Sequence, residues 1–468
     1  MPDQPITQQQ ARPQACIEAL QAQGPVQLIE THISWVLLAG AHAYKLKKPV
    51  TLPFLDYGTL EKRRFCCEEE LRLNRRFAPD LYLDVVDLAG EPAVRMRRFD
   101  ADQRLDRVSS HGDLSGAHLA RFARELARFQ ADAARAAPEF GTPQRIRADA
   151  LENFDELQSL LPVEGATLAR LRQWTEEEWL RRQADFARRH ADGCVREGHG
   201  DLHLGNLVLL GDRVVPFDGI EFNAGLRCID VASEIAFTLL DLLDHGRPGL
   251  AHWLLDAWLT WRGDFAALNV LRFYLVYRAM VRAKVAALQE RAPEAAGYLA
   301  LANRLTAPPA PTLTITCGPA GCGKSYASSR RLACADFLHT VRLRSDVERK
   351  RLFGLAPDAN SGGTIYHPEA NRLTYDRLAA LAESALAAGW SVIVDAAFLK
   401  RAERDAFSRL AARLDVPFAL LAPQASPETL VQRIGQRRDD PSEADLAVMR
   451  RQLDGFEAPG ADEPVTRG

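Results

Sequence analysis

The feature that most constrains the fold is a glycine-rich stretch, TLTITCGPAGCGKSYAS, at residues 312–328. Alternating apolar residues before it predict a strand, and the residues after it have a helical pattern. Between them, the spacing G-x-x-x-x-G-K-S begins at Gly318 and is typical of a loop whose backbone N–H groups turn toward phosphate oxygens. This order of strand, loop and helix predicts an α/β unit with a parallel sheet that binds a nucleotide.

Each residue of this loop has an expected task. Glycines allow the backbone to approach phosphates closely, and the start of a helix favours negative charge. Lys324 is expected to reach the β- and γ-phosphates of ATP, and the Ser325 hydroxyl is expected to bind Mg²⁺. The predicted ATP-binding residues of this loop are Gly318, Gly321, Gly323, Lys324 and Ser325.

Two aspartates follow the next predicted strands. Asp346 comes at the expected end of the strand in VRLRSDVERK, and Asp395 ends the apolar run WSVIVD. Because ligands of open parallel sheets collect at the carboxyl ends of strands, we expect both aspartates to lie near Lys324. Asp395 is the predicted acid that acts on Mg²⁺ or its water, and Asp346 is the predicted base for a substrate hydroxyl. Capping of the following helix is the alternative for Asp346.

The segment 312–455 resembles small P-loop kinases, especially the kinase domain of polynucleotide kinases and the zeta-type toxins. The resemblance is carried by the glycine-rich loop, Asp346-x-x-Arg349 and VIVDAAF. In those kinases the Asp-x-x-Arg element handles the acceptor, so the resemblance implies that Arg349 binds substrate. It also makes a nucleic-acid 5′-hydroxyl one of the possible acceptors.

A basic helix is predicted near the C-terminal end. LVQRIGQRRDD places Arg433 and Arg437 on one helix face. An arginine beside the phosphates can neutralise charge in the transition state, so both are candidate ATP-binding residues. A solvated basic face explains them about as well.

Prolines separate this part from the preceding chain. RLTAPPAPTLTITCG has three prolines between Ala307 and Pro311, which predicts a linker and a boundary near residue 309. Before it, short strands precede a helix with Thr59 as N-cap, and long helical patterns follow. These patterns predict a small β-rich lobe and a helical lobe. The two predicted domains are 1–308 and 309–468.

A second polar constellation lies in EGHGDLHLGNLVLL, residues 197–210. Asp201 and Asn206 are five residues apart, and RVVPFDGIEF supplies Asp218 at the end of the next strand-like run. A carboxylate can accept a hydroxyl proton, and Mg²⁺ prefers oxygen ligands. Asp201 is therefore the predicted base, and Asn206 and Asp218 are the predicted Mg²⁺ ligands. Turn capping by Asp201 and His203 is the alternative, but it does not account for the ordered set.

The strand-like segment AHAYKLKKPV offers a lysine for the nucleotide phosphates. Lys45 and Lys47 lie on one face of this strand, and Lys45 matches the A-x-K of the kinase motif V-A-I-K. A solvated sheet edge is the alternative for either lysine. Glu70, in the acidic run CCEEELRL, is the predicted ion-pair partner of Lys45, chosen over the two glutamates before it.

Residues 27–300 resemble the aminoglycoside phosphotransferase family, relatives of protein kinases, through HGDLHLGN and FDGIEF. YKLKKPV, VRMRRF and IDVASEIAF resemble, more narrowly, bacterial fusion proteins in which this domain precedes an ATP-binding P-loop domain. The resemblance implies a kinase-like fold, the same roles for Asp201, Asn206, Asp218 and Lys45, and a bracing role for Asp230 at the catalytic loop. In two departures, no clear glycine-rich loop precedes AYKLKK, and the motif Asp-Gly-Ile-Glu makes Glu221 a further candidate for contact with metal or substrate.

One helical stripe is a weaker candidate. Tyr274, Arg278 and Arg282 are spaced i, i+4, i+8 and could bind an anionic substrate. A surface or inter-domain salt-bridge face is the favoured alternative.

Composition narrows the function classes. The net charge of −3 gives no reason to expect a protein that coats nucleic acid or a membrane. We expect no signal peptide and no membrane span, and reduced cysteines in a cytoplasmic protein.

Together these patterns predict an α/β protein with two ATP sites. Each would use Mg²⁺ to transfer the ATP γ-phosphoryl group to an acceptor hydroxyl, on a small molecule in the first domain. In the second domain the acceptor would be a small molecule or a nucleic-acid 5′-hydroxyl. In the alternative, the P-loop domain is a regulatory ATPase and the kinase-like domain binds nucleotide or metabolite without catalysis. The acceptors and the oligomeric state stay open.

Overall fold

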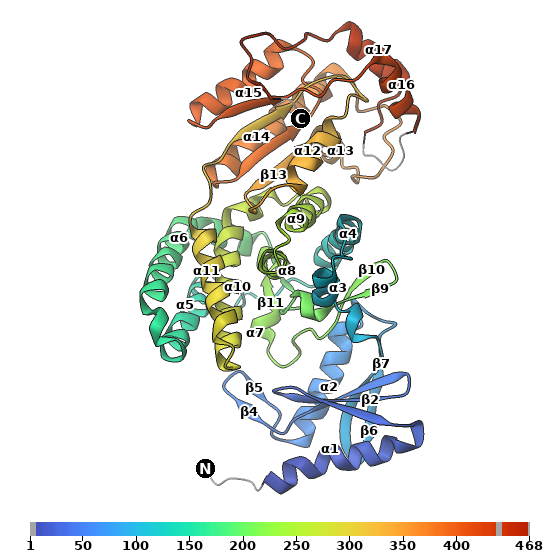
Figure 1. The fold of residues 1–468 in the computed structure, drawn as a ribbon, viewed down its shortest axis with the longest axis vertical. Coiled ribbons are helices and arrows are strands. Elements are labelled where there is room, and N and C mark those ends of the chain that lie inside the picture. The colour runs from blue at the N-terminus through green and yellow to red at the C-terminus, as the bar shows by residue number, and fades with distance from the viewer. Residues whose placement is uncertain (1–5, 437–441, 467–468) are drawn as a thin grey trace. The chain divides into compact units, whose positions relative to one another are not determined.

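The computed structural model describes residues 6–436 and 442–466 (Figure 1). The chain forms two compact units that interleave in sequence. Unit 1 contains the described chain up to His118, Phe129–Ile146 and Phe186–Asp241. Unit 2 contains Leu119–Arg128, Arg147–Asp185 and the described chain from Leu242 onward.

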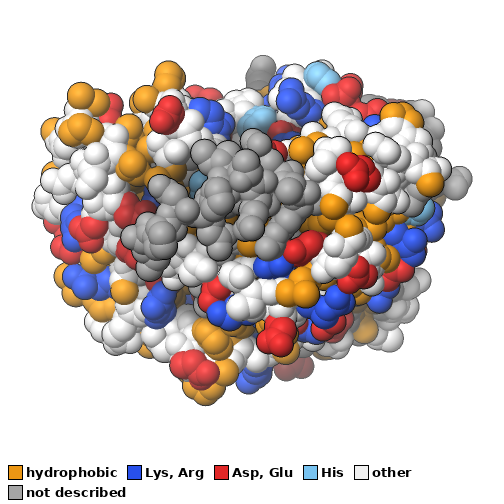
Figure 2. Space-filling view, turned by 90° about the horizontal axis from the view of Figure 1, so that it is seen from below, with side chains coloured by type: hydrophobic (Ala, Val, Ile, Leu, Met, Phe, Trp, Pro, Cys, Tyr) orange, Lys and Arg blue, Asp and Glu red, His pale blue; other side chains and the backbone are white. Residues whose placement is uncertain are grey.

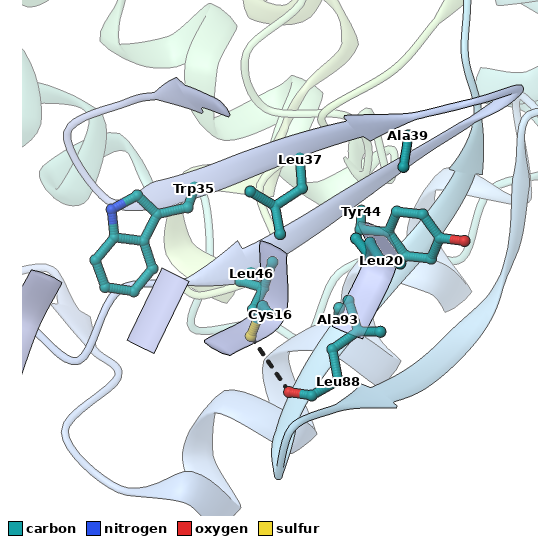
Figure 3. Packing of buried hydrophobic residues seen from close by; sticks show 9 residues of the cluster. All are labelled: Cys16, Leu20, Trp35, Leu37, Ala39, Tyr44, Leu46, Leu88 and Ala93. Atoms are coloured by element: carbon teal, nitrogen blue, oxygen red, sulfur yellow. Dashed lines mark hydrogen bonds between the residues drawn. The ribbon is translucent and has the colours of Figure 1, made fainter. Parts of the chain in front are cut away.

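Unit 1 contains a five-stranded antiparallel sheet in the order β1-β2-β3-β7-β6. One face of this sheet packs against helix α1, which the sequence patterns did not predict. The Cys16 thiol of α1 donates to the Leu88 carbonyl oxygen at 3.3 Å (Figure 3). The buried cluster on this face contains Cys16, Leu20, Trp35, Leu37, Ala39, Tyr44, Leu46, Leu88 and Ala93. The elements concerned are α1 (Ile6–Leu20), β1 (Val26–Glu30), β2 (Ser34–Ala39), β3 (His42–Lys47), β6 (Tyr82–Leu88) and β7 (Glu91–Arg97).

The opposite face of the sheet receives helix α2 (Leu60–Asn74). Because side chains alternate along a strand, Tyr44 of β3 joins the α1 cluster while Ala43 packs with Cys67 of α2. Thr59 caps α2, and its Oγ1 accepts a hydrogen bond from the Lys62 N–H at 3.2 Å. The predicted strands and the predicted capped helix of the small lobe are confirmed.

The rest of unit 1 surrounds the polar loop at residues 199–206. Strands β9 and β10 form a hairpin after this loop, and β8 pairs with β11 before helix α8. The elements are α3 (Leu105–His111), β8 (Val195–Glu197), β9 (Leu207–Leu210), β10 (Arg213–Pro216), α7 (Ala224–Arg227), β11 (Cys228–Asp230) and α8 (Val231–Asp244). A small hairpin, β4 (Thr51–Leu52) and β5 (Leu55–Asp56), precedes α2.

Long helices follow the small lobe, as the sequence patterns predicted. Helices α4, α5, α6 and α8 contribute to both units or to their sequence borders, and α9, α10 and α11 belong to unit 2. Their bounds are α4 (Gly116–Asp132), α5 (Pro143–Leu160), α6 (Gly165–Ala191), α9 (Pro248–Arg262), α10 (Leu268–Leu288) and α11 (Ala292–Thr306).

The C-terminal part of unit 2 is built on a parallel sheet in the order β13-β14-β12-β15-β16. Its strands are β12 (Leu313–Thr316), β13 (Thr340–Arg344), β14 (Ser391–Asp395), β15 (Phe418–Leu421) and β16 (Val465–Thr466). The helices are α12 (Lys324–Ala333), α13 (Ser345–Leu352), α14 (Pro368–Ala387), α15 (Arg401–Arg413), α16 (Pro427–Gln436) and α17 (Leu446–Asp454). The predicted α/β fold class, with a β-rich lobe, a helical lobe and a parallel sheet, is confirmed.

Figure 2 shows one face of the molecule. On the face seen in Figure 2, basic and acidic side chains are interspersed with apolar ones. Within the described residues, we find no helix that is both long and apolar enough to cross a bilayer.

Candidate active sites

The loop between β8 and β9 brings the predicted base beside a predicted metal ligand. Asn206 Nδ2 donates to the Asp201 carboxylate at 2.9 Å and to the Asp201 carbonyl oxygen at 3.0 Å. The amide is thereby oriented so that its oxygen is the atom that can bind a metal. His203 Nε2 lies 3.4 Å from Asp201 Oδ2, so the carboxylate is fixed from two sides.

The second predicted metal ligand has an unusual backbone. Asp218 has a φ of +64°, a conformation that costs a non-glycine residue about 1 kcal/mol or more. Its N–H donates to the Tyr82 hydroxyl at 2.8 Å, and the Gly219 N–H donates to Asn74 Oδ1 at 2.8 Å. The Phe217 N–H also donates to the Asn206 carbonyl oxygen at 3.0 Å. The segment that carries Asp218 is thus tied both to α2 and to the loop of Asn206.

Two lysines of β3 point to this same place. Lys45 Nζ lies 3.0 Å from Glu70 Oε1 and also contacts the Asp218 carboxylate. Lys47 contacts the other oxygen of Glu70 and the Glu221 carboxylate. Both lysine side chains are buried, so the alternative of a solvated edge is wrong for each. The prediction of Glu70 as the partner of Lys45 agrees with this contact, and the role of both at a phosphate stays a prediction.

Lys47 and its partners were missed as a unit by sequence reasoning. Glu221 accepts a hydrogen bond from the Tyr57 hydroxyl as well as from Lys47. A buried chain of contacts therefore runs from Tyr57 through Glu221, Lys47 and Glu70 to Lys45. The double lysine in KLK and the acid in DGIE were visible in the sequence, but their pairing was not.

The charges of this site favour phosphate and metal binding near neutral pH. Burial alone would lower the pKa of Lys45, but the Asp218 and Glu70 carboxylates hold that pKa above its ordinary value. Partial burial would raise the pKa of Asp218, but Lys45 outweighs it and the pKa lies below its usual range. Burial lowers the pKa of His199, so this imidazole is neutral.

Acidic residues of α8 brace the loop that carries Asp201. Glu234 accepts from the His199 N–H and, at 2.8 Å, from Gln130 Nε2. Asp241 accepts from the Leu204 N–H at 2.9 Å. These two acids of α8 are seven residues apart and share a face, a signal that sequence reasoning did not use.

Asp230 was expected to brace this loop, and its contacts correct that expectation. It forms a two-pronged ion pair with Arg189, with both distances 2.8 Å, and it accepts from the Ala232 N–H at 2.8 Å. Asp230 therefore stabilises the start of α8 and its contact with α6, while Glu234 and Asp241 bind the loop.

The stripe on α10 packs inside the helical part of unit 2. Tyr274 and Arg278 are buried, and Arg282 Nε donates to the Tyr298 hydroxyl of α11 at 3.2 Å. These contacts give the stripe a role in helix packing, and none of them involves a predicted site residue.

The P-loop part of unit 2 contains a cavity of about 520 Å³. It collects predicted residues from four separate segments of the chain. The predicted residues that line it are Gly321, Gly323, Lys324, Ser325, Asp346, Arg349, Asp395 and Arg433. Gly318 is absent from this lining, and Arg437 lies outside the described residues.

The glycines of the loop are required by its geometry. A Cβ at Gly318, whose φ is +134°, would lie 2.8 Å from the Cys322 sulfur. A Cβ at Gly321, whose φ is +86°, would lie 3.0 Å from the Leu430 carbonyl oxygen of α16. Lys324 Nζ donates to the carbonyl oxygens of Gly318 and Pro319, both at 2.8 Å. Phosphate oxygens can replace these carbonyl oxygens as partners of the ammonium group.

The two aspartates lie at different depths in the cavity wall. Asp395 ends β14, is buried, and accepts from the Ser328 hydroxyl at 3.3 Å. Asp346 lies within the first turn of α13, after Arg344 at the N-cap position. The capping alternative for Asp346 is therefore wrong, and its carboxylate belongs to the cavity lining.

The predicted arginines border the same cavity with different partners. Arg349 Nη2 donates to Asn371 Oδ1 at 3.0 Å, and its guanidinium lies over the Tyr366 ring. Arg433 of α16 donates to the carbonyl oxygens of Gly321 and Cys322, both at 3.3 Å. Arg433 therefore bridges α16 to the glycine-rich loop.

A second cavity of about 440 Å³ adjoins the loop. It shares Gly323, Tyr326 and Arg433 with the first cavity and continues past Arg330 and Pro423. A ligand with a triphosphate and a ring system could occupy both.

Comparisons with known proteins agree with the P-loop part. A family model described as an AAA domain matches residues 313–459. This match confirms the predicted resemblance of the C-terminal part to P-loop proteins.

Relatives that match along most of the chain occur in mycobacteria. Uncharacterized protein Rv2004c of Mycobacterium tuberculosis is 30% identical over 451 residues, which cover 91% of this chain and 90% of the relative. Uncharacterized protein Mb2027c of Mycobacterium bovis matches with the same identity and coverage.

Solved structures give weaker likenesses. The GDP complex of aminoglycoside 2′-phosphotransferase-IIIa has a TM-score of 0.42 and 13% identity, covering 64% of this chain and 98% of that one. A choline/ethanolamine kinase family protein from Mesorhizobium loti has a TM-score of 0.41 and 11% identity, and the match covers 64% of this chain and 96% of that one. A sugar kinase from Janibacter sp. HTCC2649 has a TM-score of 0.27 and 21% identity, covering 34% and 84%.

Proposed function

This chain belongs to the same family as the mycobacterial proteins Rv2004c and Mb2027c, and we propose that it is an ATP- and Mg²⁺-dependent phosphotransferase with two nucleotide sites. The observation that carries this proposal is the convergence in unit 1 of Asp201, Asn206, Asp218, Lys45 and Glu70. These residues come from four distant segments. Asp201 contacts Asn206, Lys45 contacts Glu70 and Asp218, and the backbone hydrogen bond from Phe217 to Asn206 links the two groups.

In the first site, Asp201 accepts the proton of the acceptor hydroxyl as that oxygen attacks the γ-phosphorus, and the bond to the β–γ bridging oxygen breaks to release ADP. Its hydrogen bond from Asn206 keeps the carboxylate pointed at the acceptor. Lys45 pairs with the nucleotide phosphates, and Glu70 holds it in place. The acceptor is a hydroxyl-bearing small molecule.

In the second site, Lys324 and the loop N–H groups bind the β- and γ-phosphates, and the ring system extends into the adjoining cavity. Asp346 accepts the proton of the acceptor hydroxyl, and Arg349 contacts the acceptor. Arg433 neutralises charge on the transferred group. The acceptor here is a small molecule or a nucleic-acid 5′-hydroxyl.

The donor sets suit Mg²⁺, which prefers hard oxygen ligands. Asn206 and Asp218 would hold it in the first site, and Ser325 and Asp395 would hold it in the second. When bound, Mg²⁺ supplies charge neutralisation of the phosphate oxygens.

One observation favours a second candidate function for unit 1, that of a non-catalytic nucleotide or metabolite binder. The connection between β1 and β2, Thr31 to Ile33, contains no glycine and is closed by hydrogen bonds between Thr31 and Ser34. Such a tight turn leaves fewer backbone N–H groups for phosphates than a glycine-rich loop does. In this alternative the P-loop domain would be a regulatory ATPase.

The test uses γ-labelled ATP, Mg²⁺ and a fractionated cell extract as the pool of acceptors, with the label traced by mass. Wild type, Asp201→Asn and Lys324→Ala run in parallel, and Asp80→Asn is the control because Asp80 is exposed in unit 1. We expect two labelled products, one lost in each active-site variant. Asp201→Asn should lower its product roughly 10²–10⁴-fold.

Label that appears only as free phosphate, and only while Lys324 is intact, would favour the regulatory ATPase. Formation of the first product at an unchanged rate in Asp201→Asn would remove Asp201 from the role of base.

A further inference from the structure

A buried ion pair joins the helical part of unit 2 to the P-loop site. Arg342 of β13 and Asp256 of α9 both belong to unit 2 and are both buried, with side-chain exposures of 4% and 7%. The Asp256 oxygens accept from Arg342 Nε at 3.1 Å and from Nη2 at 2.6 Å. This two-pronged geometry is the strongest arrangement for such a pair.

The remaining nitrogen of Arg342 is directed at the phosphate-binding helix. Nη1 donates to the hydroxyls of Ser329 at 2.6 Å and Ser328 at 3.1 Å, and to the Ser325 carbonyl oxygen at 3.4 Å. Ser325 is the residue that follows Lys324, so Arg342, from the end strand β13, contacts the first turns of α12.

The same nitrogen lies 4.0 Å from Asp395 Oδ2, just beyond hydrogen-bond distance. Asp395 is the predicted metal acid, and Arg344 Nε is also only 3.8 Å away. An arginine that closed on Asp395 would compete with a cation for the same carboxylate oxygens. Asp256 opposes this movement because it binds Nε and Nη2 of the guanidinium group, the two nitrogens other than the one nearest Asp395.

Close packing fixes α9 against α12. A Cβ at Gly249, in the first turn of α9, would lie 2.2 Å from the Ala333 carbonyl oxygen at the end of α12. Arg351 of α13 also donates to the Thr260 carbonyl oxygen of α9 at 2.7 Å. The position of Asp256 is therefore set by contacts on both sides of it.

We propose that Asp256, which lies outside the P-loop segment, is a positioning residue of the P-loop metal site. It holds Arg342 on α9 and α12, and so keeps the Asp395 carboxylate available for Mg²⁺. This inference rests on the proposed function of the second site, in which Asp395 binds the metal.

The test measures Mn²⁺, as a probe for Mg²⁺, by electron paramagnetic resonance with ADP bound to the full chain. All variants carry Asp218→Asn so that the first metal site does not contribute. Asp256→Asn should weaken Mn²⁺ binding about 10-fold, within the range known for residues that orient metal ligands. Adding Arg342→Gln should restore the affinity to within about 3-fold, because the competing cation is gone. Since this double variant removes both buried charges, it avoids an unpaired one.

Asp264→Ala is the control for simple destabilisation nearby, because it removes the cap that the Asp264 carboxylate forms with the Ala267 N–H before α10. Unchanged Mn²⁺ affinity in Asp256→Asn would overturn the proposal, and so would a double variant as weak as the single one. Asp395→Asn distinguishes a failure of the proposed metal site from a failure of the inference on Asp256 alone. If it leaves Mn²⁺ binding intact, the proposed metal role of Asp395 fails together with this inference. If it abolishes binding while Asp256→Asn does not, only the inference on Asp256 fails.

Discussion

The two candidate sites hold their predicted phosphate-binding lysines in different ways. In unit 1, Lys45 lies among carboxylates, with Glu70 and Asp218 as direct partners. In the P-loop part, Lys324 donates to two backbone carbonyl oxygens of its own loop. A buried ammonium group needs opposite charge to offset its desolvation, whereas a partly exposed one needs only dipoles. Charge partners therefore fix the first site, and backbone geometry fixes the second.

This difference predicts that Lys324→Ala separates activity from stability. Removing a cation aimed at developing phosphate charge should lower turnover at the P-loop site by roughly 10²–10³-fold. The thermal midpoint should stay close to that of wild type, since no buried carboxylate loses its partner. Turnover and thermal unfolding are measured on the same preparation, so that the predicted loss of activity and the predicted unchanged thermal midpoint are both checked. A large fall in the midpoint would show that Lys324 has a structural role like that of Lys45.

The opposite outcome is expected for Glu70→Gln in the first site. Two buried lysines share this carboxylate, but Lys45 keeps Asp218 and Lys47 keeps Glu221. The loss of stability should therefore be about 3 kcal/mol, at the low end for one partner of a buried pair. Chemical denaturation monitored by a unit 1 probe measures it. Glu68→Gln, on the exposed side of the same helix, should change stability little.

Acid should destabilise unit 2 through a neutral histidine. His252 of α9 is buried, its Nδ1–H donates to the Pro248 carbonyl oxygen at 3.0 Å, and its pKa is lowered by burial to about 4. Because the unfolded chain binds this proton near pH 6.5 and the folded chain does not, stability falls as pH drops from about 6.5 to about 4. The loss should be roughly 2 kcal/mol at pH 5.

The pH dependence of unfolding in His252→Asn provides the comparison. Between pH 7 and pH 5, the free energy of unfolding should fall by roughly 2 kcal/mol less in the variant than in wild type. Parallel curves for the two proteins would exclude His252 as the source of the acid effect.

The smallest expected effect concerns backbone geometry in the P-loop. Gly321→Ala meets a positive φ and a carbonyl oxygen 3.0 Å from the new Cβ, which should cost about 1–2 kcal/mol. Gly354→Ala is the control, because its φ is also positive but nothing lies within 4 Å of the added atom. Only Gly321→Ala should also weaken nucleotide binding, as measured by titration calorimetry. Equal effects of both variants would show that close approach to α16 does not matter.

Sequence reasoning anticipated the elements that depend on short-range patterns. The alternation of β3 placed Lys45 and Lys47 on one face, and the glycine spacing predicted strand, loop and helix around Lys324. The N-cap at Thr59 followed from local chemistry as well. It missed α1, because Pro13 lies inside that segment and its glutamines leave little apolar periodicity to indicate a helix.

Apart from Lys45 and Glu70, whose pairing was predicted, the charged groups that meet were decided by tertiary structure. Lys47 and Glu221 are 174 residues apart, and Arg342 and Asp256 are 86 residues apart. The support of the Asp201 loop by Glu234 and Asp241, in place of Asp230, was decided in the same way. Spacing within a segment fixes which side chains share a face, because strand and helix periods are local properties. Which faces meet depends on the packing of the whole chain, and burial then makes each pairing of opposite charges necessary.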